Sequence, residues 1–182
     1  MRPSSCSRPR SSFRLLIIGE TGSGKTGVTE RILGSLLSFV DPGLVTVLDF
    51  APNYRGVGRP LAVSGVGGER VRLVRPPRIF APRLEGRSCE EVWLYARLNA
   101  EATSRALSEY LSRPTPVLFV NDLSVHLHAG DERLMLEALE RSSFFVGNAY
   151  YGEKLRDACG LWERERKSIE RLAEEVDLVW RL

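Results

Sequence analysis

A glycine-rich stretch between a short apolar run and an amphipathic segment constrains the fold more than any other feature of this sequence. Residues 13–18 (FRLLII) are predicted to form a buried strand, and residues 24–40 carry apolar side chains at helical spacing. After a turn signal at residues 41–43, residues 44–50 form a second apolar, β-branched run. The chain therefore begins with strand, loop, helix and strand, in which the helix is a crossover between two strands.

The rest of the chain continues this alternation. Strands are predicted at residues 71–74, 117–122, 144–149 and 177–182, and helices at residues 88–110, 131–142 and 153–176. Ser88 and Glu91 form a predicted capping box at the start of the first of these helices. We therefore expect an α/β fold, a three-layer sandwich with a mostly parallel sheet covered by helices on both faces.

The 182 residues fit one domain, which we place at residues 13–182 behind a disordered basic leader at residues 1–12. No apolar run is long enough to span a membrane, so we predict a cytoplasmic protein without a membrane partner. The three cysteines, Cys6, Cys89 and Cys159, are far apart in sequence and are predicted to be isolated thiols.

Residues 19–26 (GETGSGKT) match the phosphate-binding pattern G-x-x-x-x-G-K-[ST] between a predicted strand and helix. Glycines let the backbone fold around phosphate oxygens and aim its N–H groups at them, at the positive end of the helix dipole. Lys25 is expected to meet the β and γ phosphates, and the Thr26 hydroxyl to bind Mg²⁺. The predicted nucleotide contacts are Gly19, Glu20, Thr21, Gly22, Ser23, Gly24, Lys25, Thr26 and Gly27.

Polar side chains at the ends of other predicted strands are candidates for the rest of the site. Asn121 and Asp122 close one strand, Asp49 closes the second, and Asn148 lies near the end of another. Ligands gather at this edge of an open α/β sheet. Asp122 is predicted to orient the attacking water or to hold the metal, and Asn148 either to sense the γ phosphate or to cap the loop. Asp49 and Asn121 are further metal candidates.

The residues 19–26 and the strand ending at Asn121 and Asp122 resemble the P-loop NTPases that have an additional strand between the loop strand and the Walker B strand, the RecA, HerA and FtsK-like ATPases. This resemblance implies the P-loop NTPase fold and ATP hydrolysis coupled to a conformational change. The Walker B strand of that class typically ends in Asp and then Glu, so Asn121 departs from the pattern and slow hydrolysis is expected.

The stretch around Asp49, Asn53, Tyr54 and Arg55 resembles two different families. One is the HerA/FtsK-like DNA pumps, and the other is the P-loop kinases similar to the seryl-tRNA kinase group. Three hypotheses follow: an ATPase, a kinase that transfers the γ-phosphoryl group to a hydroxyl near Asp49 and Arg55, and a slow nucleotide-holding switch. No guanine-reading Asn-Lys-x-Asp run occurs, which favours ATP over GTP by resemblance.

Two further features remain open in the sequence. The segment Arg55 to Arg87 contains eight arginines and two acidic residues, so it is a nucleic-acid contact, a lid over phosphates or a solvated basic surface. His126 and His128 are two residues apart, a spacing that in a strand would put both on one face, but two histidines alone do not make a metal site. An oligomeric state is possible and is not specified by the sequence.

Overall fold

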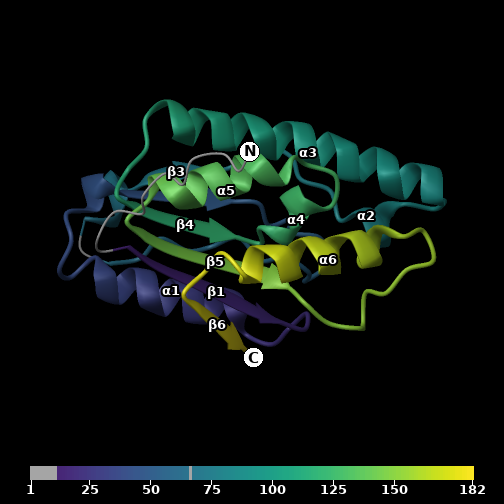
Figure 1. Ribbon diagram of the computed structural model, residues 1–182, viewed down its shortest axis with the longest axis horizontal. Helices are drawn as coiled ribbons and strands as arrows, with labels where there is room; N and C mark the ends of the chain where they lie inside the picture. Colours follow the sequence, from purple (N-terminus) through teal and green to yellow (C-terminus); the bar gives the residue numbers. More distant parts are fainter. Residues whose placement is uncertain (1–11, 66) are drawn as a thin grey trace, which may run out of the picture.

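The computed structural model describes residues 12–65 and 67–182, so the predicted leader at residues 1–12 lies, apart from Ser12, outside the described residues. Six strands form one parallel sheet in the order β3-β2-β4-β5-β1-β6 (Figure 1). Their bounds are β1 (Phe13–Gly19), β2 (Val45–Asp49), β3 (Arg72–Val74), β4 (Val117–Asn121), β5 (Phe144–Tyr150) and β6 (Leu178–Arg181). The predicted α/β class with a parallel sheet is confirmed.

Helices cover both faces of this sheet (Figure 1). Helix α1 (Lys25–Leu36) packs on one face, against β1, β4 and β5. The other face is covered by α3 (Cys89–Ser112), α5 (Glu132–Arg141) and α6 (Leu161–Ala173), whose apolar side chains join one core cluster with the sheet. The shorter elements are α2 (Pro82–Glu85), α4 (Ser124–Leu127) and the 3₁₀ turns η1 (Pro42–Leu44) and η2 (Gly68–Arg70). These layers agree with the predicted three-layer sandwich.

The continuous apolar runs of the central strands follow from burial on both faces. In β1, Leu15 and Ile17 belong to the cluster on the α1 side, whereas Leu16 and Ile18 belong to the cluster under α3, α5 and α6. Strand β4 alternates in the same way, and all five of its residues are buried. A strand that is buried on both faces does not alternate between apolar and polar residues. Its apolar run therefore predicts a strand only through its short length and the turn residues on either side.

The sheet order places β5 between β1 and β4. Ile17 pairs with Asn148 across β1 and β5, and Asp49 pairs with Asn121 across β2 and β4. Because all these strands are parallel, their carboxyl ends lie at one edge of the sheet. The polar residues that close the strands are thereby brought together with the loop that follows β1.

Helix α3 is the longest helix, and its start follows the predicted cap. The Ser88 hydroxyl accepts a hydrogen bond from the Glu91 N–H at 3.3 Å, while the Glu91 carboxylate accepts from the N–H of Arg87. None of the helices within residues 12–65 and 67–182 combines the length and apolarity needed to cross a bilayer.

The predicted helix at residues 153–176 is wrong at its N-terminal end, because α6 begins only at Leu161. Gly160 adopts the left-handed conformation with φ of 82° and is the N-cap residue. The Asp157 carboxylate accepts hydrogen bonds from the N–H groups of Cys159, Leu161 and Trp162. These contacts end the loop at residues 151–160 and start the helix, which helical periodicity alone did not reveal.

His126 and His128 do not lie in a strand, so the condition under which their spacing would place them on one face is not met. The chain turns directly after β4, where Asp122 has a left-handed φ of 56°, and residues 124–127 form the short helix α4. His126 contacts the Thr103 hydroxyl and the Asp131 carbonyl, whereas His128 contacts Arg83 and Glu165. The two rings therefore have separate surroundings.

The prediction of isolated thiols is wrong for two of the three cysteines. Cys89 and Cys159 form a disulfide bond across a sequence separation of 70 residues. The bond joins the first residue of α3 to the loop at residues 151–160, and the Trp93 indole N–H donates to the Cys159 carbonyl beside it. Sequence spacing did not reveal the pairing because the two elements meet only in the folded chain. Cys6 lies outside the described residues.

Removing this disulfide is expected to destabilise the fold. In the chain-entropy account a cross-link over such a loop restricts the unfolded ensemble, so Cys89→Ser/Cys159→Ser should lower the free energy of unfolding by about 2–4 kcal/mol. Urea unfolding of the oxidised protein and of the double variant measures the difference. Reductant should bring the wild-type protein to the level of the variant and leave the variant unchanged. Equal unfolding midpoints for all samples would contradict the prediction.

Candidate functional site

The site begins with the glycine-rich loop, residues 19–24, between β1 and α1. Gly22 and Gly24 adopt left-handed conformations with φ of 76° and 91°, which glycine takes without the strain of a Cβ atom. Gly24 is also the N-cap residue of α1, so the free N–H groups of the first helical turn lie beside the loop. The loop and the positive end of the helix together make a surface suited to an anion.

Lys25 folds back over this loop. Its ammonium nitrogen donates to the carbonyls of Gly19 at 2.9 Å and Glu20 at 2.6 Å. Burial lowers the pKa of Lys25, and the nearby carboxylates of Asp122, Glu20 and Glu165 partly offset this effect. The cation is thus held at the loop by two carbonyl groups and, at 3.5 Å, by the Ser23 hydroxyl, which a bound anion is able to replace as partners.

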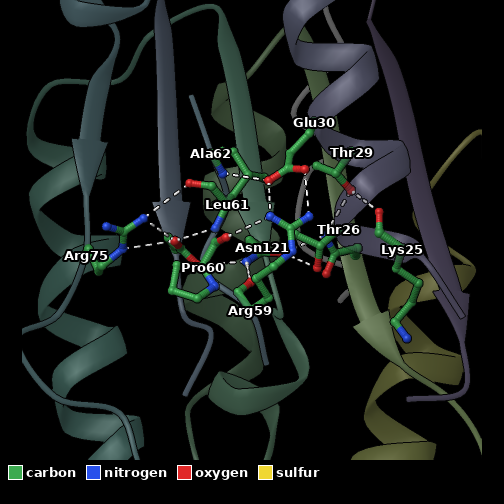
Figure 2. Close-up of polar contacts among 12 residues, drawn as sticks. Lys25, Thr26, Thr29, Glu30, Arg59, Pro60, Leu61, Ala62, Arg75 and Asn121 are labelled. Carbon is green, nitrogen blue, oxygen red and sulfur yellow. Dashed lines mark hydrogen bonds and ion pairs between the residues drawn. The ribbon is translucent and has the colours of Figure 1, made fainter. Parts of the chain in front are cut away.

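Asn121 connects the helix that carries Thr26 to the ends of the neighbouring strands (Figure 2). Its amide oxygen accepts from the Thr26 hydroxyl at 3.3 Å and from the Asn148 amide at 2.8 Å. Its amide nitrogen donates to the Asp49 carboxylate at 2.8 Å and to the Arg59 carbonyl at 3.2 Å. Both ends of the buried amide are therefore occupied by protein partners.

Asp49 is 1% exposed and anchors the loop that follows β2. Its carboxylate accepts from Arg75 at 2.6 Å and 3.0 Å, from the Leu61 N–H at 2.9 Å and from Asn121 (Figure 2). Glu30 of α1 holds the same loop through Arg59 and the Ala62 N–H. These contacts assign Asp49 to anchoring, and its role at a metal stays a prediction.

Asp122 follows β4 and lines the cavity described below. Its N–H donates to the Asn148 amide oxygen, and its carboxylate accepts from the Ser124 hydroxyl, both at 2.9 Å. Burial raises the pKa of Asp122; the Glu165 carboxylate adds to the rise, while Ser124, Lys25 and His128 oppose it. The amide nitrogen of Asn148 donates to the Thr29 hydroxyl and to the Asn121 amide oxygen. One side chain therefore contacts both Asp122 and Asn121. Its role as a phosphate sensor stays a prediction.

A cavity of about 390 Å³ joins these groups. Its lining includes the glycine-rich loop with Lys25 and Thr26, and the side chain of Asp122. It also includes Arg83, His128 and Glu165, which contact one another and which we call the buried cluster. The sequence analysis named His128 and the segment that includes Arg83, but no sequence motif joined either of them to Glu165; α2, the residue after α4, and α6 bring the three together from distant parts of the chain.

Glu20, predicted as a nucleotide contact, has a further role at the loop. Its carboxylate accepts from its neighbour Thr21 and from the N–H groups of Glu153 at 2.9 Å and Lys154 at 3.1 Å. Burial raises the pKa of Glu20, but these backbone hydrogen bonds outweigh it and leave the pKa below its usual value. The loop at residues 151–160, which also carries the disulfide, is therefore fixed to the glycine-rich loop.

The arginine-rich segment between Arg55 and Arg87 is not an array of free cations. Four of its eight arginines pair with carboxylates, and others lie over aromatic rings. The ion pairs are Arg59 with Glu30, Arg70 with Asp41, Arg75 with Asp49 and Arg83 with Glu165. These contacts favour an internal structural use of the segment, and nucleic-acid binding stays a prediction.

No protein-family model matches this sequence, and comparison with curated proteins gives no significant match. The chemistry of the site is therefore argued from its geometry.

The contacts of Asn121 explain why an aspartate, typical at the end of this strand in the resembling class, is unsuitable here. Asn121→Asp would replace the amide that donates to Asp49 with a second carboxylate at about 2.8 Å. We expect the variant to lose roughly 1–3 kcal/mol of unfolding free energy at neutral pH. Repulsion raises the folded-state pKa of the carboxylate pair above its unfolded value, so stability should return as the pH falls through that raised pKa.

Urea unfolding across the pH range tests this expectation. The exchanged variant Asp49→Asn/Asn121→Asp restores one carboxylate and one amide, and should be more stable at neutral pH than Asn121→Asp alone. A loss of stability that is independent of pH would show that charge repulsion is not its cause.

Proposed function

We propose that this chain is a P-loop NTPase that binds ATP with Mg²⁺ at residues 19–27 and hydrolyses it. The observation that carries the proposal is the GETGSGKT stretch, which folds between β1 and α1 with left-handed glycines and with Lys25 held on the loop. The position of β5 between β1 and β4 adds support, since an additional strand there is typical of the resembling ATPase class.

The residues present fit a magnesium ion bound mainly by phosphate and water. Thr26 would supply a hydroxyl, and Asp122 lines the same cavity. No group of three or more possible metal-ligating side chains occurs in the described part of the chain. Mg²⁺ usually takes one or two protein ligands and completes its shell with phosphates and waters, so the donor set is sufficient. When bound, the ion would neutralise charge on the phosphates.

Asp122 is the residue that would orient the attacking water. Its carboxylate is held by Ser124, its backbone is held by Asn148, and it shares the cavity with Lys25. The raised pKa makes it a stronger base in its ionised form than an exposed aspartate. Asn121 would support Thr26 from behind through its amide oxygen.

A conformational response would arise in the loop at residues 51–63. This loop is fixed to α1 through Glu30 and to the strand ends through Asp49 and Asn121. Pro52, Gly56 and Arg59 line the cavity with the glycine-rich loop. Asn121, which holds this loop through Arg59, is also hydrogen-bonded to Thr26. Binding or loss of a nucleotide phosphate near Thr26 would therefore change how this loop is held.

A second candidate function is phosphoryl transfer to a hydroxyl, and a cavity of about 390 Å³ whose lining includes residues besides the predicted phosphate contacts favours it. The sequence analysis placed the acceptor near Asp49 and Arg55. Asp49 is instead occupied by Arg75, Leu61 and Asn121, and Arg55 lies over the Tyr54 ring. These contacts occupy the Asp49 carboxylate with protein partners, so an acceptor hydroxyl would need a different part of the cavity lining.

Two substitutions separate nucleotide binding from turnover. Lys25→Ala removes the cation expected at the phosphates and should abolish detectable ATP binding, whereas Asp122→Ala should retain binding and reduce turnover by about 100-fold or more. Calorimetric titration with ATP and Mg²⁺ measures binding, and phosphate release measures turnover. Unchanged turnover in Asp122→Ala would exclude Asp122 as the water-orienting group.

The raised pKa of Asp122 predicts the acid side of the pH profile. Turnover should fall as the pH decreases through this pKa, because a protonated carboxyl group accepts no proton, and the fall should begin at higher pH than for an ordinary aspartate. Initial rates of phosphate release across the pH range test this. Asp122→Asn should show low turnover without that acid limb; the same limb in this variant would assign it to another group.

A further inference from the structure

Arg59 differs from the other basic residues of the cavity lining in how it is held. Those residues, within the described chain, are Lys25, Arg59, Arg83 and His128. Lys25 is hydrogen-bonded to the glycine-rich loop, and Arg83 and His128 belong to the buried cluster. The side chain of Arg59, in contrast, is 54% exposed. Arg59 is therefore the lining cation whose side chain has room to take a second position.

The present partner of Arg59 is Glu30 of α1 (Figure 2). The guanidinium donates to the two carboxylate oxygens of Glu30 at 2.6 Å and 2.7 Å. The hydrogen bonds to Glu30 raise the pKa of Arg59, burial opposes this rise, and the charges of Glu30 and Asp49 add to it. Exposed ion pairs contribute little net stability, so a guanidinium in this setting changes partners at a low cost.

Glu30 does not depend on Arg59 as its sole partner. Its carboxylate also accepts a hydrogen bond from the Ala62 N–H at 2.7 Å, and its side chain is 18% exposed. A carboxylate that loses its cation is strongly destabilising when it stays buried and unpaired. Because Glu30 keeps a backbone donor and some access to water, Arg59 can leave it without that penalty.

The main chain of Arg59 is fixed close to Thr26. The Asn121 amide donates to the Arg59 carbonyl at 3.2 Å and accepts from the Thr26 hydroxyl at 3.3 Å (Figure 2). Thr26 and Glu30 are four residues apart in α1, so their side chains lie on one side of the helix, about 6 Å apart along its axis. A turn of the Arg59 side chain toward the start of α1 therefore moves the guanidinium from Glu30 toward the predicted phosphate contacts.

The charges around the glycine-rich loop favour a second cation when a nucleotide binds. The carboxylates of Asp122, Glu20 and Glu165 all act on Lys25. A terminal phosphate group carries roughly two negative charges at neutral pH, whereas Glu30 carries one. The planar guanidinium of arginine also matches the oxygens of a phosphate group with two parallel hydrogen bonds. A γ phosphate would therefore compete with Glu30 for Arg59.

We propose that Arg59 leaves Glu30 when ATP binds and donates to the γ-phosphoryl oxygens, where its charge stabilises the transition state of hydrolysis. The proposal rests on the proposed nucleotide binding at residues 19–27. It adds a catalytic residue to that function, together with the carboxylate that holds this residue in its second position.

In hydrolysis the water oxygen forms a bond to the γ phosphorus. The bond between that phosphorus and the oxygen bridging it to the β phosphate breaks, and its electron pair leaves on ADP. A proton of the water passes to the Asp122 carboxylate. Arg59 takes no part in proton transfer, and its contribution is the electrostatic stabilisation of charge on the transferring group. Loss of Arg59 should therefore affect the transition state more than the binding of ADP.

The first test measures the binding of a transition-state analogue by calorimetry, with the full chain, Mg²⁺ and either ADP alone or ADP with aluminium fluoride. Wild-type protein should bind the aluminium fluoride complex more tightly than ADP. Arg59→Ala should bind ADP with wild-type affinity and the aluminium fluoride complex at least about 100-fold more weakly than wild type. Equal affinity of both proteins for the aluminium fluoride complex would overturn the proposed role of Arg59.

Arg59→Lys keeps a cation for Glu30 and hence the anchor of the loop, but it lacks the planar fork. It should bind ADP as wild type does and the aluminium fluoride complex at least about 10-fold more weakly. This variant covers the case in which Arg59→Ala fails to fold, and wild-type affinity of Arg59→Lys for the complex would contradict the proposed bidentate contact.

The second test separates catalysis from anchoring of the loop, with Glu30→Gln as the matched variant. Glu30→Gln opens the same ion pair, while its amide oxygen still accepts from the Ala62 N–H. It should hydrolyse ATP and bind the aluminium fluoride complex at least as well as wild type, whereas Arg59→Ala should release phosphate about 100-fold more slowly. Equal losses in both variants would assign Arg59 to anchoring alone.

The same measurements distinguish this proposal from the one on which it rests. Wild-type protein that binds neither ADP nor ATP would overturn the proposed nucleotide function. Wild-type protein that binds ADP and releases phosphate from ATP, with Arg59→Ala equal to it in both tests, would overturn the role of Arg59 and leave the nucleotide function in place.

Discussion

The hydrogen bonds of the Asn121 amide are the interaction on which the arrangement of the site depends. One buried side chain joins Thr26 of α1, Asp49 of β2 and Asn148 of β5. Because donors and acceptors are all matched, the network has a low cost of burial and a single favoured arrangement. An aspartate at this position would bring two carboxylates together, so the departure from the usual strand ending is tied to the presence of Asp49.

The site is also held together from the opposite side. Glu20 fixes the loop at residues 151–160 to the glycine-rich loop, and the Cys89–Cys159 disulfide fixes the same segment to α3. Asp157 of this segment caps α6 and approaches Arg83 of the buried cluster. The segment at residues 151–160 thus links the predicted phosphate contacts with the buried cluster. It has no regular secondary structure and is held in place by these side-chain contacts.

Most of the fold was predictable, because strands and helices are set by local patterns. The strands at β1, β2, β4 and β5, the start of α3 and the parallel sheet followed from apolar runs and turn residues. Two local features were missed because hydrophobic periodicity does not report turn conformations. The start of α6 depends on Asp157 and Gly160, and the turn into α4 depends on the left-handed conformation of Asp122.

The sequence by itself determined the glycine-rich loop between a strand and a helix, since loop conformation and the helix start are encoded within a few consecutive residues. It also determined that a buried strand ends at this Asn-Asp pair, although the strand closes at Asn121 and Asp122 already belongs to the turn. Only the tertiary structure decided the partners: Asn121 with Asp49, Cys89 with Cys159, and Arg83 with Glu165 and His128. These contacts join residues far apart in the chain, and their energies depend on burial and distance, which exist only after the sheet and its covering helices have assembled.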